Sequence, residues 1–184
     1  TMTPPADAKV PEDREDHVIL VDAHDAPIGT MEKMEAHRQG RLHRAFSIFL
    51  FNTAGELLLH QRALSKYHSG GLWTNTCCSH PRDGETVLEA AHRRLEEEMG
   101  MTAALQPQFS FIYKRMLDQG LTEHEFDHVL FATSDAPPIP NPDEVASYRY
   151  ATLDDIAVDI AAHPDQYTEW FKICFHEVQA RRRA

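Results

Sequence analysis

The sequence lacks any long hydrophobic run and contains few cysteines. Its longest apolar run spans residues 45–51, far short of the roughly 20 residues that a membrane helix needs. The N-terminus also lacks the basic-then-apolar pattern of a signal peptide, so we expect a cytoplasmic protein with no membrane partner. The sequence has three cysteines, and two of them, Cys77 and Cys78, are adjacent, which excludes the disulfide scaffold of a small secreted protein.

Basic residues are also in the minority. There are 18 Lys and Arg against 29 Asp and Glu, which gives a formal net charge of −11. Nonspecific nucleic-acid binding needs a basic surface, so we expect no nucleic-acid partner. An acidic protein can still bind an anionic small molecule where local cations or a metal reverse the field. The twelve histidines raise the expectation of a metal site.

The chain length of 184 residues fits one domain. We predict that residues 1–16 form a disordered acidic and Pro-rich tail and that residues 17–184 form a single domain. Apolar runs bounded by turn residues predict strands at 17–21, 45–52, 56–62, 72–80, 109–117, 123–133 and 145–151. Helical spacing predicts helices over 86–99, 153–162 and beyond Pro164, with 32–38 as a helical turn or a loop. This outline is typical of an α/β sandwich.

One extended segment, residues 74–81, carries two reactive side chains. In a strand, Cys78 and His80 would point to one face and Cys77 to the other. A small buried thiol and a hydrogen-bonded core histidine would explain both residues more simply than a functional site. This segment alone does not decide between these interpretations.

Acidic residues alternate along a second segment, so that Glu123, Glu125 and Asp127 share one face of the predicted strand. Like charges at this spacing repel and are costly to bury. Either this face is solvated, or a cation holds the carboxylates together.

Two histidines, His37 and His43, flank a short loop, and each could be an ordinary surface residue. A single site for Zn²⁺, Mn²⁺ or a similar ion would explain several separated residues jointly, because imidazole nitrogens and carboxylates are its usual ligands. The candidate ligands are His37, His43, His80, Glu123 and Glu125.

The predicted helix over 86–99 carries a third pattern. Arg94 and Glu98 are four residues apart and share one side of the helix, which is also common on an exposed helix. The run Glu85, Arg93, Leu95, Glu97-Glu98 and Gly100-Met101 matches most of the Nudix box, a strand–loop–helix whose carboxylates hold Mg²⁺ against a diphosphate. Two positions depart from it, because Ser79 replaces a glycine and Arg94 replaces a glutamate. The lost carboxylate argues against hydrolysis.

Together these segments resemble type I isopentenyl-diphosphate isomerases, which are Nudix-fold enzymes. The resemblance runs from about residue 17 to the C-terminal helix. Its motifs are Glu32-Lys33 with His37, Arg41-Leu42-His43, residues 62–66, residues 73–81, Glu123-His124-Glu125 and Trp170. It implies an α/β (α+β) fold, a Nudix-like α/β/α sandwich with a mixed central sheet. It also implies the interconversion of isopentenyl and dimethylallyl diphosphate, for isoprenoid biosynthesis.

The resemblance assigns roles to individual residues. Cys78 and Glu125 would exchange protons with the substrate from opposite sides, Tyr113 would hydrogen-bond Glu125, and Trp170 would lie over the carbocation-like intermediate. The diphosphate would contact Lys33, Arg62, Lys66 and Arg94.

The resemblance also implies two metal sites. One divalent ion (Mn²⁺, Zn²⁺ or Mg²⁺) would bind His37, His43, His80, Glu123 and Glu125, and Mg²⁺ held by Glu98 would accompany the substrate diphosphate. The expected partner is a prenyl diphosphate, and the expected oligomeric state is a monomer or a weak homodimer. The alternative is a Nudix hydrolase of a nucleoside diphosphate derivative.

Overall fold

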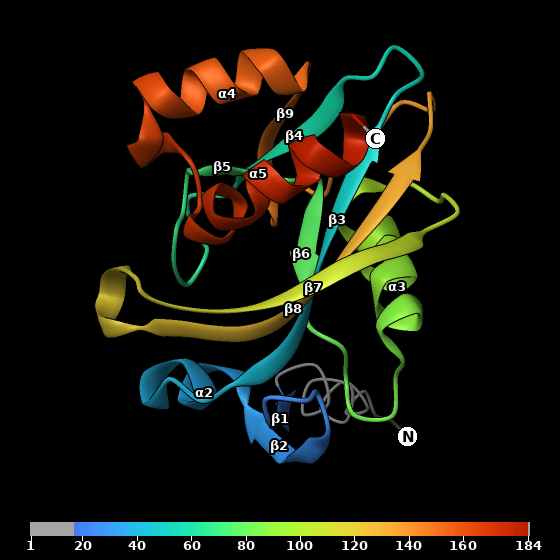
Figure 1. Ribbon diagram of the computed structural model, residues 1–184. Coiled ribbons are helices and arrows are strands. Elements are labelled where there is room, and N and C mark those ends of the chain that lie inside the picture. Colours follow the sequence, from blue (N-terminus) through green and yellow to red (C-terminus); the bar gives the residue numbers. More distant parts are fainter. Residues whose placement is uncertain (1–16, 184) are drawn as a thin grey trace, which may run out of the picture.

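The computed structural model of the chain describes residues 17–183, so the predicted tail at 1–16 lies outside the described residues. A mixed β-sheet occupies the centre, with helices on both faces (Figure 1). Helix α3 (Val87–Met99) packs on one face, and α4 (Leu153–Ala162) and α5 (Glu169–Arg183) pack on the other. The sandwich predicted from the sequence is confirmed.

The sheet is built around β3 (His43–Phe51), which pairs in parallel with β8 (Thr122–Thr133) along its whole length. Strand β8 also pairs antiparallel with β7 (Gln106–Met116). On the other side, β4 (Leu57–Arg62) joins β3 at a single residue pair and then pairs with β9 (Val145–Ala151). A hairpin of β1 (His17–Val21) and β2 (Pro27–Glu32) completes the sheet beside the start of β3.

Alternation along the central strands directs side chains to two separate cores. On β3, Phe46, Ile48 and Leu50 face α3, where Leu95 and Met99 are among their neighbours in the core. The intervening residues, such as Phe49, and the odd-numbered residues of β8, such as Val129 and Phe131, belong to the core beneath α5. Successive side chains of a strand point to opposite faces, so Glu123, Glu125 and Asp127 lie on the α5 side, near one end of this second core.

The predicted single strand over 72–80 is wrong. Two short strands replace it, β5 (Trp73–Thr74) on β4 and β6 (Cys77–Ser79) on β3. Between them, Asn75 Nδ2 donates to the backbone oxygens of Ile48 and Cys77, and the Thr76 hydroxyl donates to the carbonyl of Leu58. The segment therefore crosses from one strand to the other where β3 and β4 diverge, and side chains replace the missing ladder bonds.

Strand β2 was not predicted, because its sequence begins with proline and contains glycine, and both are uncommon inside strands. It lies at an edge of the sheet, where a proline at the first position is tolerated. The next segment is the short helix α2 (Lys33–Gln39), which ends at Gly40 in the left-handed conformation (φ 67°). This helix places His37 beside the start of β3.

The helix predicted over 86–99 is confirmed. Thr86 caps its N-terminus in a capping box with Glu89, and Gly100 ends it with φ 63°. Two short 3-10 turns, η2 (Asp118–Gly120) and η3 (Pro164–Gln166), connect β7 to β8 and α4 to α5. Within residues 17–183, every helix is too short or too polar to span a bilayer.

Candidate active site

Two buried histidines aim their free ring nitrogens at one carboxylate. His37 Nδ1 lies 2.7 Å from the carbonyl oxygen of Lys33, and His43 Nδ1 lies 2.9 Å from that of Arg41. These contacts place a hydrogen on each Nδ1, because a carbonyl can only accept. Each Nε2 then faces Glu123 Oε1, at 2.9 Å and 3.4 Å respectively.

These facing atoms are buried without a hydrogen-bond partner. His37 Nε2, His43 Nε2 and Glu123 Oε1 approach one another but do not meet hydrogen-bond geometry. Buried polar atoms are almost always satisfied, and two lone pairs aimed at a carboxylate oxygen need a positive charge between them. A proton or a divalent cation supplies that charge, so the donor set fits a metal ion.

Four potential ligands lie together, with one ligand atom of each within 4.8 Å of the others: His37, His43, His80 and Glu123. The fifth candidate, Glu125, is adjacent, because its Oε2 lies 3.0 Å from His80 Nε2 and 3.4 Å from His43 Nε2. The parallel pairing of β3 with β8 sets His43 directly opposite Glu125. The structure thus brings all five sequence-predicted ligands to one place, from α2, β3, β8 and the residue after β6.

The carboxylates of this cluster are buried, and neighbouring histidines lower their pKa. Burial raises the pKa of Glu123, but contacts with His37, His43 and His68 hold it well below its ordinary value. Burial and the charge of Glu123 likewise raise the pKa of Glu125, but contacts with His43 and His80 lower it overall. At 2% and 6% exposure, these residues exclude a solvated outer face, and that interpretation of the alternating acids is wrong.

The thiol of Cys78 lies beside this histidine–carboxylate cluster, and its hydrogen-bond partners are outside the cluster. The indole N–H of Trp170 on α5 donates to Cys78 Sγ at 3.0 Å, and the thiol lies 3.0 Å from Asn75 Oδ1. On the cluster side, the Tyr113 hydroxyl donates to Glu125 Oε1 at 2.6 Å. Cys77 faces the core beneath α3 instead, as the strand alternation predicted.

A buried acid, Asp127, adds to the electrostatics around Cys78. Both of its carboxylate oxygens lie 2.9 Å from the hydroxyl of Ser47, the residue paired with Cys78 across β3 and β6. Burial raises the pKa of Cys78 to about 12, the charge of Asp127 adds to this, and the Trp170 hydrogen bond opposes it. Burial and the charge of Glu125 also raise the pKa of Asp127 well above its ordinary value.

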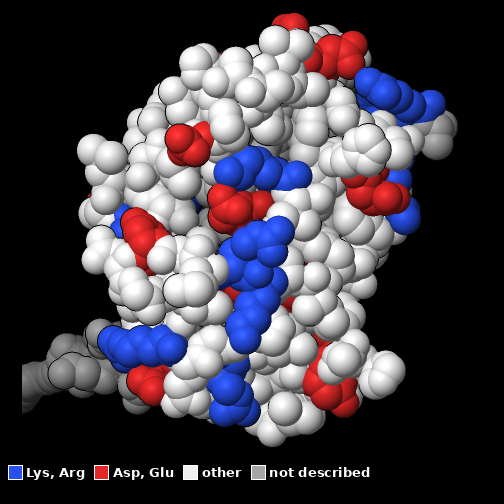
Figure 2. All heavy atoms as spheres, turned by 60° about the vertical axis from the view of Figure 1, so that its left-hand side comes forward, with Lys and Arg blue, Asp and Glu red and all other residues white. Residues whose placement is uncertain are grey.

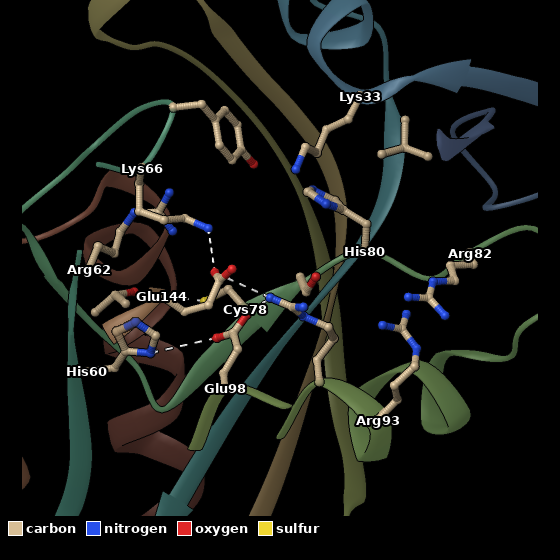
Figure 3. A pocket seen from close by; sticks show the side chains of 15 residues that line it. Lys33, His60, Arg62, Lys66, Cys78, His80, Arg82, Arg93, Glu98 and Glu144 are labelled. Atoms are coloured by element: carbon tan, nitrogen blue, oxygen red, sulfur yellow. Dashed lines mark hydrogen bonds and ion pairs between the residues drawn. The ribbon is translucent and has the colours of Figure 1, made fainter. Parts of the chain in front are cut away.

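An outer cavity of about 170 Å³ opens above Cys78 and is rich in cations. Its walls include Lys33, Arg62, Lys66, Arg82, Arg93 and Arg94. Arg62 and Lys66 lie on one side of this cavity and Arg82 and Arg93 on the opposite side (Figure 3). Figure 2 shows a band of Lys and Arg side chains, interrupted by acids, across one face of the molecule. The electrostatic field in this cavity therefore differs from the one that the net charge of −11 would suggest.

Several of these cations contact acidic or aromatic groups. Lys66 Nζ lies 2.6 Å from Glu144 Oε1, and Arg94 Nη2 lies 3.4 Å from the same atom. The guanidinium of Arg62 lies 5.3 Å from the ring centre of Trp170, and its Nε is buried without a partner. This pairing connects the cationic cavity to the deeper region around Cys78.

The candidate Mg²⁺ residue, Glu98, reaches the same cavity from α3. It is buried and pairs with Arg94, as their spacing predicted. Its other oxygen lies 3.6 Å from Cys77 Sγ and 3.9 Å from His60 Nδ1. One carboxylate oxygen of Glu98 thus faces a guanidinium, and the other faces a thiol and an imidazole.

Sequence comparisons identify the family of the chain. A model of the Nudix domain matches residues 41–171. The isopentenyl-diphosphate Delta-isomerase of Pectobacterium atrosepticum is 54% identical over 161 residues, which cover 88% of this chain and 90% of that relative. The chain belongs to the isopentenyl-diphosphate isomerase family of Nudix proteins. Isopentenyl-diphosphate Delta-isomerase 1 of Aromatoleum aromaticum is 51% identical over 168 residues, covering 91% of this chain and 95% of that relative.

Solved structures support the same fold. The crystal structure of DR0079 from Deinococcus radiodurans superposes with a TM-score of 0.67 at 26% identity, covering 79% of this isomerase-family chain and 89% of its own. A MutT protein from Methanosarcina mazei gives a TM-score of 0.63 at 17% identity, covering 78% of this chain and 96% of its own. The second likeness concerns the fold alone.

Three contributors to the site in this isomerase-family chain were not singled out from the sequence. His68 contacts Glu123, Tyr67 lines the cavity, and Asn75 holds the thiol of Cys78. His68 and Tyr67 lie outside the motifs identified in the sequence, and the bonding partner of His68 is distant in the sequence. Asn75 lies within the motif at residues 73–81, but no role was assigned to it. Asp127 was placed on the correct face, but its burial against Ser47 was not foreseen.

Proposed function

We propose that the chain interconverts isopentenyl diphosphate and dimethylallyl diphosphate. The observation that carries this proposal is the position of Cys78 next to a buried histidine–carboxylate cluster, beneath a cavity lined by cations. The family relationship supports the same substrate class. The reaction would serve isoprenoid biosynthesis, and the cytoplasmic location and monomeric or weakly dimeric state expected from the sequence stay predictions.

The reaction adds a proton to the terminal alkene carbon and removes one from the allylic CH2 group that is bonded to the inner alkene carbon. Two groups are needed, one that gives a proton and one that takes it, and their roles reverse in the back reaction. Cys78 and Glu125 are the proposed pair. The pKa of the thiol is raised and that of the carboxylate is lowered, which favours a protonated Cys78 beside an ionised Glu125.

The intermediate carries positive charge on the prenyl chain. The ring of Trp170, which is 3% exposed, would stabilise that charge by about 0.5–2 kcal/mol and exclude water that would otherwise trap the cation. Tyr113 would fix the orientation of Glu125 through the 2.6 Å hydrogen bond.

A divalent ion, Mn²⁺, Zn²⁺ or Mg²⁺, is proposed to be held by the three histidines with Glu123 and Glu125. When bound, it would supply positive charge that neutralises the two buried carboxylates and sets the proton affinity of Glu125. The unpartnered nitrogens of His37 and His43 support this assignment.

The diphosphate would bind in the outer cavity. Lys33, Arg62, Lys66 and Arg94 are the proposed contacts, and Glu98 is proposed to hold the accompanying Mg²⁺. Arg94 also distinguishes isomerase from hydrolase, because it places a guanidinium where the Nudix box has a carboxylate. A hydrolase would have no use for the buried thiol.

The decisive experiment is incubation with isopentenyl diphosphate in deuterium oxide, followed by NMR and mass spectrometry of the products. We expect dimethylallyl diphosphate that carries solvent deuterium and no released phosphate. Parallel incubations with nucleoside diphosphate derivatives should leave those compounds intact. Release of phosphate without double-bond movement would refute the proposal in favour of the hydrolase.

A further inference from the structure

His68 lies in the loop between β4 and β5, and its side chain reaches the histidine–carboxylate cluster that is proposed to bind the metal ion. Its side chain is 1% exposed. One ring nitrogen, Nε2, lies 3.0 Å from Glu123 Oε2, and the other, Nδ1, lies 3.0 Å from the hydroxyl of Ser69. An ionised carboxylate can only accept, so Nε2 carries a hydrogen and donates it to Glu123, while Ser69 donates to Nδ1.

This bond leaves Glu123 with one oxygen for a metal. Oε2 is bonded to His68, whereas Oε1 is the buried, unpartnered atom that faces His37 and His43. Partners that hydrogen-bond a metal-binding side chain fix its orientation and its ligand atom. A Glu123 held in this way would bind through Oε1 alone, and the remaining coordination positions would be left to other groups.

The backbone around His68 also supports the diphosphate cavity. Its carbonyl accepts a 3.0 Å hydrogen bond from Arg62 Nη2, and its ring packs edge-on against Tyr67 and Trp170. The next residue, Ser69, has φ 54°, and its backbone N–H donates to Asp118 of the β7–β8 connection. His68 is therefore bonded both to Glu123 of the histidine–carboxylate cluster and to Arg62 of the cationic cavity, and these bonds fix its position.

We propose that His68 is a positioning residue that restricts Glu123 to monodentate metal binding and couples the cationic loop 62–72 to the metal centre. This inference rests on the proposed metal site. His68 is not assigned as a ligand, because its Nε2 is bonded to Glu123 Oε2, whereas the other oxygen, Oε1, faces His37 and His43.

Two matched substitutions separate the hydrogen bond from the bulk of the side chain. His68→Gln places an amide N–H near the position of Nε2 and can still donate to Glu123. His68→Asn places its amide near the position of Nδ1 and cannot reach that carboxylate. The control is His92→Gln, which replaces an exposed histidine on α3. Thermal unfolding of the metal-free variants checks that each is folded.

Mn²⁺ binding to metal-free protein is measured by loss of the free-ion EPR signal. We expect His68→Asn to weaken binding about 10- to 100-fold, with His68→Gln within about threefold of the unsubstituted protein and the control unchanged. Equal affinity of the Asn variant and the unsubstituted protein would overturn the role of His68, and so would equal weakening by Asn and Gln. If the unsubstituted protein itself binds no Mn²⁺, both this role and the proposed metal site fail.

Discussion

Replacing Trp170 by Phe tests the bond between the indole and the thiol. The substitution removes the N–H that donates to Cys78 Sγ at 3.0 Å but keeps an aromatic ring in a position that is 3% exposed. Hydrogen bonds to charged groups contribute about 1.5–3 kcal/mol. If Cys78 becomes a thiolate during the reaction, losing this donor should lower kcat about 10- to 150-fold.

The same substitution should change the acidity of the thiol. Burial and Asp127 raise the pKa of Cys78, and the indole bond lowers it, so Trp170→Phe should raise the pKa further. The rate of iodoacetamide modification against pH would report this in a Cys77→Ala background, with peptide mapping to identify the modified residue. The alkylation profile should shift to higher pH.

A comparison with Trp170→Ala separates the ring from its N–H. The alanine variant also loses the cation-facing ring, which adds about 0.5–2 kcal/mol to the barrier. It should therefore be slower than the phenylalanine variant, while the KM of both changes less than kcat. A kcat for Trp170→Phe within threefold of the unsubstituted enzyme, with an unshifted alkylation profile, would refute the proposed action of the indole on the thiol.

Four further predictions address other parts of the site. Cys78→Ala should abolish deuterium incorporation while Cys77→Ala, on the opposite face of the strand, retains most of it; the reverse ranking would contradict the assignment. Exhaustive chelation should stop turnover and added divalent metal should restore it, whereas full activity of protein shown to be metal-free would exclude the ligand set. Tyr113→Phe removes a buried hydrogen bond to Glu125 and should reduce kcat about 10- to 150-fold; an unchanged kcat would mean that other groups hold the carboxylate. Burial lowers the pKa of His60 in the folded protein. As the pH decreases below about 6.5, the unfolded state is therefore protonated at this residue before the folded state, and the free energy of unfolding decreases. His60→Gln should flatten that fall in urea titrations by at most about 1.4 kcal/mol per pH unit, and an unaltered slope would exclude this histidine as its source.

Local patterns in the sequence predicted much of the site because strands and helices impose short periods. The two-residue period correctly placed Glu123 and Glu125 together and set Cys77 opposite Cys78. The helix over 86–99 followed from its spacing and its terminal glycine. These features depend only on residues that are close together in the sequence, so they can be predicted without knowing the fold.

Other features depend on contacts between distant segments. His68 bonds to a residue 55 positions away, and no spacing rule connects the two. The break at Asn75 and Thr76 follows from the divergence of β3 and β4, which the segment itself does not encode. The burial of the alternating acids depends on histidines from α2, β3 and the residue after β6, so their solvated alternative could be excluded only in three dimensions.

The shared face of β8 has a consequence for how the chain can change. Phe131 packs against Phe49 in the core beneath α5, and Glu125 lies on the same face six residues earlier, roughly 20 Å along the strand. Deleting or inserting one residue between them would turn either the aromatic ring or the carboxylate to the opposite face. Single-residue insertions and deletions within this strand would therefore disrupt either the core or the site, whereas substitutions preserve the alternation of its side chains.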